Sequence, residues 1–232
     1  MPGLARPGDN LYMRDRIIDE QISYYRMRAA EYDVTAYGSL PAARERIARV
    51  ISHLPQNAST LELACGTGMW TEALANRTSV ITAIDASPEA IAIAERRCPA
   101  SVTFVCADIW QWIPDRRYQL IFFGFWLSHV RTSRIPAFFG LLDRALEPTG
   151  QVVFVDEQAS PAPEERRTSD PEVVERTLDD GSVHRLVKVF VKPDSMVDRL
   201  DRLGWRCEFT PDGKDWMVGR AQRKPADLQP ND

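Results

Sequence analysis

The 232-residue sequence has few of the features that would mark a membrane, secreted or metal-binding protein. Its longest apolar run covers only residues 120–127, and the first residues lack the apolar core of a signal peptide. A membrane-spanning helix needs about 20 residues. The four cysteines lie far apart without a C-x-x-C pair, and no zinc-ligand spacing links them to the three histidines. We therefore expect a cytoplasmic protein with reduced cysteines, no metal site and no membrane partner.

A strongly basic charge is also missing. The chain carries 29 Lys and Arg against 33 Asp and Glu, a net charge of −4, whereas a general nucleic-acid binder presents a basic surface. We expect a small-molecule substrate and no nucleic-acid partner, in a monomer or a homodimer. The length and the 44% hydrophobic content suit one domain. It is expected over residues 15–223, between disordered ends at 1–14 and 224–232.

Strand-like and helix-like segments alternate along the first two thirds of the chain. A helical region at 15–55 comes first. Apolar runs at 59–64, 80–85, 102–106, 119–124 and 151–156 then alternate with helical segments near 69–76, 88–97 and 134–146. Apolar strands separated by helices are typical of a parallel sheet covered on both faces. The sequence therefore predicts an α/β fold with a doubly wound, mostly parallel sheet.

After residue 156 the pattern changes. Residues 157–172 are rich in proline and charge, which indicates a loop or lid. Segments 173–178 and 183–191 flank Asp179-Asp180-Gly181-Ser182, which is typical of a hairpin turn. A helix at 193–203 and a last strand at 205–209 follow. We expect a lid and a hairpin over 157–191.

The first strand runs into Leu61-Glu62-Leu63-Ala64-Cys65-Gly66-Thr67-Gly68, a glycine turn that leads into a helix. Glycine permits a tight turn and a close approach of a ligand to the backbone. Asp85 ends the next strand, where its carboxylate can accept both hydroxyls of a ribose. A nicotinamide-dependent dehydrogenase would need a third glycine, but Thr71 stands there. The adjacent Trp70 is a poor neighbour for a pyrophosphate and a good wall for a small zwitterion.

The E-L-A-C-G-T-G pattern with Asp85 behind it resembles motif I of the class I S-adenosylmethionine (SAM)-dependent methyltransferases. The resemblance implies SAM as cofactor and a Rossmann-like seven-stranded sheet with an N-terminal helical cap and an antiparallel edge hairpin, an edge that the order of elements from residue 173 onward fits. It also implies that Asp108 takes the adenine amino group, although Asp108 equally suits a helix N-cap. The implied cofactor contacts are Tyr25, Glu62, Ala64, Gly66, Gly68, Trp70, Asp85, Ala86, Ser87, Asp108, Ile109, Phe123 and Trp126.

Three further stretches resemble a narrower group, the small phosphonate O-methyltransferases of dehydrophos-type antibiotic biosynthesis. They are residues 21–33, residues 125–130 and the hairpin pattern R-T-L-x-D-G…V-K-V-F between 176 and 190. The resemblance implies that Tyr32, His129, Arg176 and Lys188 surround an anionic acceptor, with His129 either hydrogen-bonding the acceptor or acting as a base. The expected function is methyl transfer from SAM to an oxygen of this acceptor.

Several alternatives stay open at this point. The acceptor can be another small hydroxyl or carboxylate metabolite, and the chain can be a non-catalytic cofactor-binding subunit. The basic residues of the hairpin can also form an ordinary solvated face. A two-residue Asp180-Gly181 turn would pair Arg176 with Arg185 and point Lys188 to the opposite face, whereas a one-residue bulge would reverse this.

Overall fold

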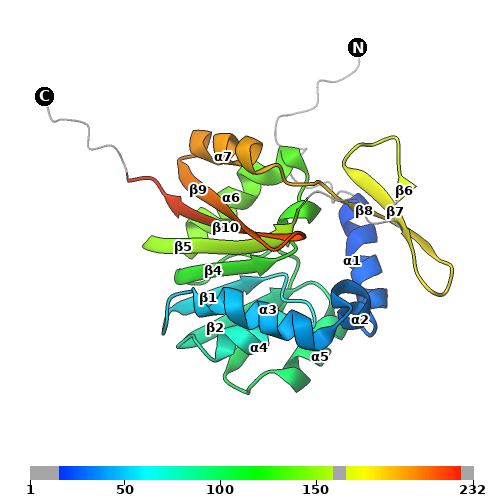
Figure 1. Cartoon of the computed structure of the whole chain (residues 1–232), viewed down its shortest axis with the longest axis horizontal. Helices are drawn as coiled ribbons and strands as arrows, with labels where there is room; N and C mark the ends of the chain where they lie inside the picture. The colour runs from blue at the N-terminus through cyan, green and yellow to red at the C-terminus, as the bar shows by residue number, and fades with distance from the viewer. Residues whose placement is uncertain (1–15, 159–165, 226–232) are drawn as a thin grey trace, which may run out of the picture.

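The computed structural model describes residues 16–158 and 166–225, and a seven-stranded sheet lies at its centre (Figure 1). The strand order is β3-β2-β1-β4-β5-β10-β9; β1 to β5 pair in parallel, and β10 is antiparallel to both β5 and β9. The strands are β1 Ser59–Leu63, β2 Val80–Asp85, β3 Val102–Cys106, β4 Tyr118–Gly124, β5 Leu146–Glu157, β9 Trp205–Asp212 and β10 Trp216–Arg223. The predicted doubly wound, mostly parallel sheet is confirmed.

Helices cover both faces of this sheet, as apolar strands require. Successive residues of β4 alternate between two cores: Ile121 and Phe123 pack on the side of α6, whereas Leu120 and Phe122 pack on the side of α3 and α4. The helices are α1 Arg16–Arg28, α2 Tyr32–Tyr37, α3 Leu40–Ser52, α4 Met69–Ala75, α5 Pro88–Arg97, α6 Ile135–Ala145 and α7 Pro193–Arg202, with short 3-10 turns at Leu127–His129 and Thr132–Arg134. No helix within the two described ranges is long and apolar enough to cross a membrane.

The predicted hairpin forms, but it is not the edge of the main sheet. Strands β6 (Arg166–Arg167), β7 (Val173–Thr177) and β8 (Val183–Val187) make a separate antiparallel sheet beside α1 (Figure 1). Leu186 and Val174 pack there on Tyr24, so α1 rather than β5 buries the apolar face of the hairpin. The predicted ends at 1–14 and most of 224–232 lie outside the described residues, as does part of the predicted 157–172 lid.

The antiparallel edge instead consists of β9 and β10, and β10 was missing from the sequence prediction. Its Gly219 explains the omission, because glycine weakens a strand pattern. A Cβ at Gly219 would lie 2.2 Å from Cζ of Phe154 on the neighbouring strand β5. Glycine is therefore required for the ring of Phe154 to pack across β10.

Candidate active site

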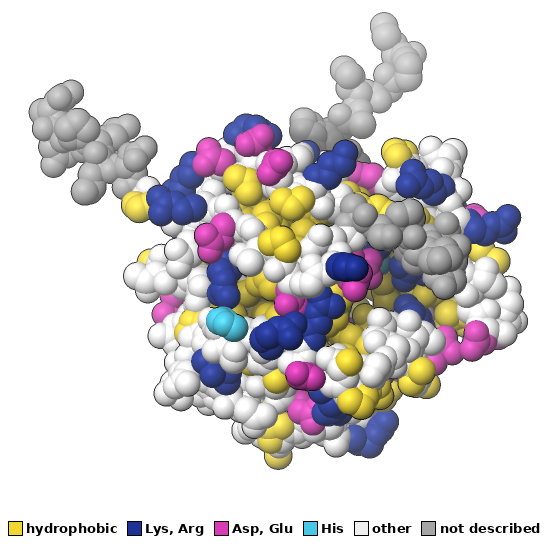
Figure 2. All heavy atoms as spheres, in the orientation of Figure 1, with side chains coloured by type: hydrophobic (Ala, Val, Ile, Leu, Met, Phe, Trp, Pro, Cys, Tyr) yellow, Lys and Arg dark blue, Asp and Glu magenta, His cyan; other side chains and the backbone are white. Residues whose placement is uncertain are grey.

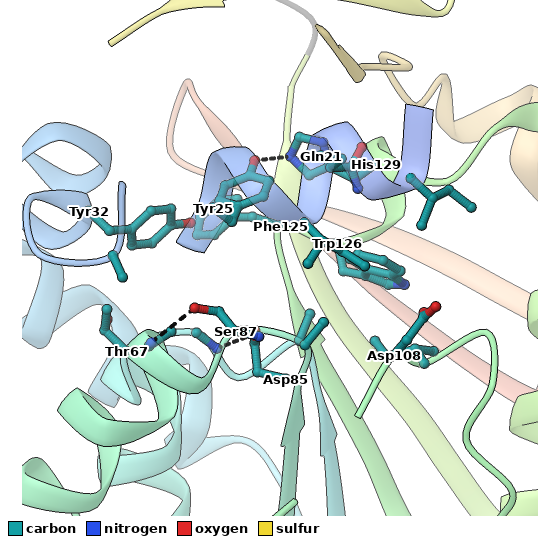
Figure 3. A pocket seen from close by; sticks show the side chains of 18 of the residues that line it. Gln21, Tyr25, Tyr32, Thr67, Asp85, Ser87, Asp108, Phe125, Trp126 and His129 are labelled. Carbon is teal, nitrogen blue, oxygen red and sulfur yellow. Dashed lines mark hydrogen bonds between the residues drawn. The ribbon is translucent and has the colours of Figure 1, made fainter. Parts of the chain in front are cut away.

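A cavity opens at the carboxyl ends of β1, β2 and β4, where ligands bind in doubly wound sheets. We call it the first cavity. Figure 3 shows Tyr25, Tyr32 and His129 on one side of it, facing Asp85, Ser87 and Asp108 on the other. The predicted residues that line it are Tyr25, Tyr32, Ala64, Gly66, Asp85, Ala86, Ser87, Asp108, Ile109, Trp126 and His129.

The glycine turn is held in place by Asp85. One carboxylate oxygen of Asp85 accepts the N–H of Gly66 and the other accepts the N–H of Ser87, both at 2.8 Å. Burial raises the pKa of this carboxyl, and the backbone N–H groups oppose that rise. Gly66 has φ of +56° and open space where a Cβ would stand. The turn therefore presents bare backbone and a carboxylate to the cavity.

Asp108 is not a helix N-cap, because only a turn follows β3, but its side chain holds that turn and also reaches the cavity. Its Oδ1 accepts the N–H of Trp110 at 3.0 Å, and its Oδ2 accepts from the side chain of Gln111. The carboxylate stabilises the turn after β3 and still lines the first cavity. Holding this turn and lining the cavity are therefore compatible roles for Asp108.

Four predicted cofactor residues lie behind the cavity wall rather than on it. Glu62 is 1% exposed inside β1, and Phe123 stacks on Phe154 in the core with ring centroids 5.0 Å apart. Gly68 faces α5, since a Cβ there would stand 2.9 Å from the Cβ of Ala94. Trp70 is likewise buried. Its indole N–H donates to the hydroxyl of Tyr37, and its ring fills the space beside Gly124. These four side chains support the wall and do not line the cavity, while a cofactor contact through the backbone near Phe123 stays a prediction.

The helical cap is tied to the glycine turn by a residue that the sequence did not single out as functional. Asp33 of α2 accepts from the hydroxyl of Thr67 at 2.5 Å and pairs with the guanidinium of Arg97. Thr67 lies between the two glycines and lines the first cavity. Asp33, the last residue of the stretch 21–33, thus anchors the helical cap over the cavity.

Both ring nitrogens of His129 are engaged. Nδ1 lies 2.7 Å from the carbonyl oxygen of Val187, and Nε2 lies 2.8 Å from the hydroxyl of Tyr25 (Figure 3). A carbonyl only accepts, so Nδ1 carries the proton and Nε2 accepts from Tyr25. Burial, with the charges of Lys188 and Arg176, lowers the pKa of His129 well below its usual value. The neutral imidazole of His129 thus links α1 to β8 by hydrogen bonds, and both of its nitrogens are already bonded.

A second cavity, with about 1370 Å³ of open space, adjoins the first. The two share Tyr25, Tyr32, Phe125 and His129 as a common wall. The second cavity also brings in Arg176 from β7 and Lys188, which follows β8. The four residues predicted around an acceptor therefore line one space, although they come from four separate parts of the chain.

The register of the hairpin explains how Arg176 and Lys188 come to share a face. Thr177 pairs with Val183 and Arg176 with His184, and the loop between them spans residues 178–182. Gly181 in this loop has φ of +83°, the left-handed conformation of a bulge glycine. The pairing is shifted by one residue from that of a two-residue turn. The bulged alternative is the one observed.

Other residues on the two walls escaped sequence reasoning. Phe125 follows β4 with φ of +55° and lines both cavities, but a non-glycine residue in that conformation leaves no mark in the sequence. Gln21 is 4% exposed, lines the first cavity and accepts the N–H of Val187 at 3.0 Å. Its position among apolar residues of an amphipathic helix was an available signal, because a buried amide needs a partner.

Residues 60–150 match the family model described as Methyltransferase domain. The chain is 36% identical to DhpI in its complex with S-adenosylhomocysteine (SAH), with a TM-score of 0.80 over 90% of this chain and 98% of that chain. A second DhpI structure, a complex with SAM and HEP, gives a TM-score of 0.79 at 36% identity over 89% and 97% of the two chains.

Curated relatives match over shorter stretches. The chain is 32% identical over 150 residues to the malonyl-[acyl-carrier protein] O-methyltransferase of Paenibacillus sp. (strain JDR-2), which is 58% of this chain and 52% of that protein. It is 34% identical over 102 residues to nodulation protein S of Rhizobium tropici, 42% of each. The chain thus spans about half the length of these relatives or less.

The doubly wound sheet, the glycine turn with Asp85 and the capped cavity define a class I methyltransferase fold. The chain belongs to the SAM-dependent methyltransferases, and SAM is its cofactor. The first cavity fits this cofactor on two observations of its own. Among the residues described, none accepts a hydrogen bond from the buried indole N–H of Trp126, a residue of the cavity wall. The carboxylate of Asp85 has capacity for further donors such as ribose hydroxyls.

Proposed function

We propose that this chain is an O-methyltransferase that acts on an anionic oxygen of a small acceptor, with a phosphonate as the leading class. The observation that carries the proposal is the second cavity, which shares a wall with the cofactor cavity and contains the cationic groups of Arg28, Arg176 and Lys188. An acceptor held there reaches the first cavity across Tyr32 and Phe125.

The cofactor supplies an activated methyl group on a sulfonium. The contribution of the chain is to hold the acceptor oxygen in line with that methyl group, about 3–3.5 Å away, and to exclude water. The guanidinium fork of Arg176 and the ammonium of Lys188 suit a tetrahedral anion. Tyr32 and Phe125 are rigid side chains at the boundary of the cavities and would limit the approach to one direction.

The state of His129 supports an acceptor that is already ionised. Its pKa is low and both nitrogens are bonded, so it is a weak candidate for the base that a neutral hydroxyl acceptor would require. A phosphonate oxygen carries negative charge near neutral pH, as the second pKa of about 6 for phosphate groups indicates. We propose that His129 positions Tyr25 and Val187 and does not remove a proton.

In the first cavity we propose that Asp85 accepts the ribose hydroxyls and that Asp108 and the Ile109 N–H hold the adenine. Tyr25 and Trp126 would cover the methionine part. The support is that all of these residues line one cavity with two carboxylates on one side and the aromatic cap on the other (Figure 3).

Two comparisons bear on the acceptor. DhpI has been solved with SAM and HEP, and it matches this chain over nearly its whole length. This likeness supports a phosphonate as the acceptor, because the hairpin that provides Arg176 and Lys188 also resembles the phosphonate O-methyltransferases. The Paenibacillus relative is named for O-methylation of a malonyl group, so a carboxylate is the second candidate. On the face shown in Figure 2, Lys and Arg side chains stand among Asp and Glu without forming a continuous basic surface, which favours a small acceptor over a nucleic acid.

The test is a panel of small phosphonates, carboxylates and neutral alcohols, with release of SAH and the mass of the methylated product as readouts. We expect the phosphonates to be methylated on oxygen with the highest kcat/KM. Higher kcat/KM for the carboxylates would move the assignment to the second candidate. Turnover of neutral alcohols alone would contradict an anionic acceptor.

A further inference from the structure

Lys188 has an unusual environment for a cation expected to bind a substrate. Its side chain is 2% exposed, and its Nζ lies 2.6 Å from Oε2 of Glu157 and 3.4 Å from Oγ of Ser128. Its charge also acts on the buried carboxyl of Asp156. Burial raises the pKa of Asp156 above its usual value, and the charge of Lys188 opposes that rise. A buried ammonium needs such compensation, because an unpaired charge in the interior is costly.

The two carboxylates near Lys188 differ in their freedom to move. Asp156 is fully buried, and its two oxygens accept the N–H groups of Ser128 and Glu157 at 2.8 Å each. The side chain of Glu157 is 43% exposed and lines the second cavity. Glu157 also borders a neighbouring groove that contains Arg46 and Gln158. Of these two carboxylates, only that of Glu157 faces the second cavity and also borders a neighbouring groove into which it can move.

An acceptor anion and Glu157 therefore compete for the same ammonium. We propose that Glu157 is a resident counter-ion of Lys188 that the anionic group of the acceptor displaces, which makes Glu157 a specificity-determining residue of the methyltransferase. The proposal rests on the proposed function, since it requires an anion at Lys188. It commits the site to acceptors that bring their own negative charge.

The exchange has a consequence for selectivity. When an anion replaces Glu157, the buried ammonium keeps a negative partner throughout. If a neutral acceptor displaced Glu157, the ammonium of Lys188 would keep only Asp156 and Ser128 as partners. A neutral acceptor therefore gains no binding energy by displacing Glu157. Glu157 thus weakens the binding of any acceptor that displaces it from Lys188, and only a charged group recovers that loss with an ion pair of its own.

The experiment measures binding of methylphosphonate to the SAH complex by calorimetry. We expect Glu157→Gln to lower the Kd of methylphosphonate at least fivefold, because the amide competes less well for Lys188. The matched control is Asp179→Asn, which removes one negative charge from the same cavity. Among the contacts described, Asp179 forms no ion pair with Lys188, so this variant should change the Kd less than twofold. SAH affinity within twofold of wild type shows that both variants are folded.

Two outcomes would overturn the inference alone: an unchanged or higher Kd in Glu157→Gln, or an equal decrease in Asp179→Asn, which would show a general field effect. A third variant separates this result from the proposed function. Lys188→Met should abolish methylphosphonate binding while the SAH Kd stays within twofold. If Lys188→Met binds and methylates phosphonates as wild type does, the anionic site at Lys188 is wrong, and the role of Glu157 falls with it. Dimethyl methylphosphonate, which is neutral, should bind no better to Glu157→Gln than to wild type.

Discussion

The two cavities share a wall but differ in charge and in origin. Within the described ranges, the first is lined by the carboxylates of Asp85 and Asp108 and by no lysine or arginine, and most of its wall comes from strand ends and one helix. The second contains three cationic side chains and three carboxylates, supplied by α1, β5, the hairpin and the segments that follow them. In the first, backbone groups and neutral side chains accompany two carboxylates, without a cationic side chain among the described lining residues. The second is a site in which opposed charges must be exchanged or shared.

This difference teaches how the two sites depend on the fold. The first cavity follows from the sheet: once β1 and β2 are adjacent, Gly66 and Asp85 meet at the same edge. The second cavity exists only because the hairpin packs on α1 and its register is shifted by one residue. Substitutions should therefore separate into those that change cofactor binding and those that change acceptor binding.

The largest expected effect concerns Glu62, directly behind the first cavity. Burial raises the pKa of its carboxyl from 4.5 to about 8. The folded protein keeps a proton that the unfolded chain releases, so the free energy of unfolding falls as the pH rises from 4.5 to about 8 and stays low above that. We expect Glu62→Gln to equal wild type near pH 4.5 and to be more stable at pH 9 by about 4 kcal/mol. Urea unfolding at both pH values measures this, with the exposed Glu95→Gln as control; a difference that does not vary with pH would contradict it.

The next effect is a loss of cofactor binding. Asp85→Ala removes the acceptor for the Gly66 and Ser87 N–H groups and the proposed acceptor for the ribose hydroxyls. Charge-assisted hydrogen bonds contribute about 1.5–3 kcal/mol each, so the Kd of SAH should rise about a hundredfold, or about 3 kcal/mol. Calorimetry with SAH checks this, and the exposed Asp115→Ala serves as control. A change below fivefold would remove Asp85 from the cofactor site.

The same contrast explains what could be read from the sequence. The sheet, its helices and the glycine turn were predictable because their signals are local: apolar periodicity, and glycines followed by a carboxylate at a fixed interval. β10 was missed because Gly219 interrupts its apolar pattern, for a reason that lies on β5. The antiparallel edge was predicted, but local signals did not place the 173–187 hairpin, because its packing on α1 is a contact between distant segments.

The site residues divide in the same way. Side chains at strand ends, such as Asp85 and Asp108, could be placed in a cavity from position alone. Whether a side chain within a strand faces the cavity or the core depends on packing, so Glu62 and Phe123 lie behind the wall. The shared face of Arg176 and Lys188 depends on a single bulge residue, and no local pattern distinguishes the two registers.

A third prediction tests the second cavity in isolation. Arg176→Gln removes a guanidinium from that cavity and none from the first, so the KM of a phosphonate acceptor should rise about tenfold, or about 1.4 kcal/mol, with an unchanged SAH Kd. The matched control is Arg185→Gln, from the partner strand of the hairpin, whose guanidinium is 51% exposed and pairs with Glu20. Such surface pairs contribute little, and the control should change KM less than twofold. Equal effects in both variants would mean that the hairpin acts only through its overall charge.

The smallest expected effect should appear in both cavities at once. Val187 is bonded from two sides: Gln21 accepts its N–H and His129 donates to its carbonyl oxygen, and both of these side chains line the first cavity. Lys188 follows directly in the chain and lines the second. Gln21→Met leaves the Val187 N–H unpaired, which costs about 1 kcal/mol and loosens the position of Lys188.

We therefore expect Gln21→Met to raise the SAH Kd and the acceptor KM together, each about threefold to fivefold. Calorimetry with SAH and steady-state kinetics with a phosphonate measure the two changes on one protein preparation. The preceding variants of Asp85 and Arg176 provide the contrast, because each should affect one cavity. If Gln21→Met changes only one of the two constants, Val187 does not join the sites and the two cavities act independently.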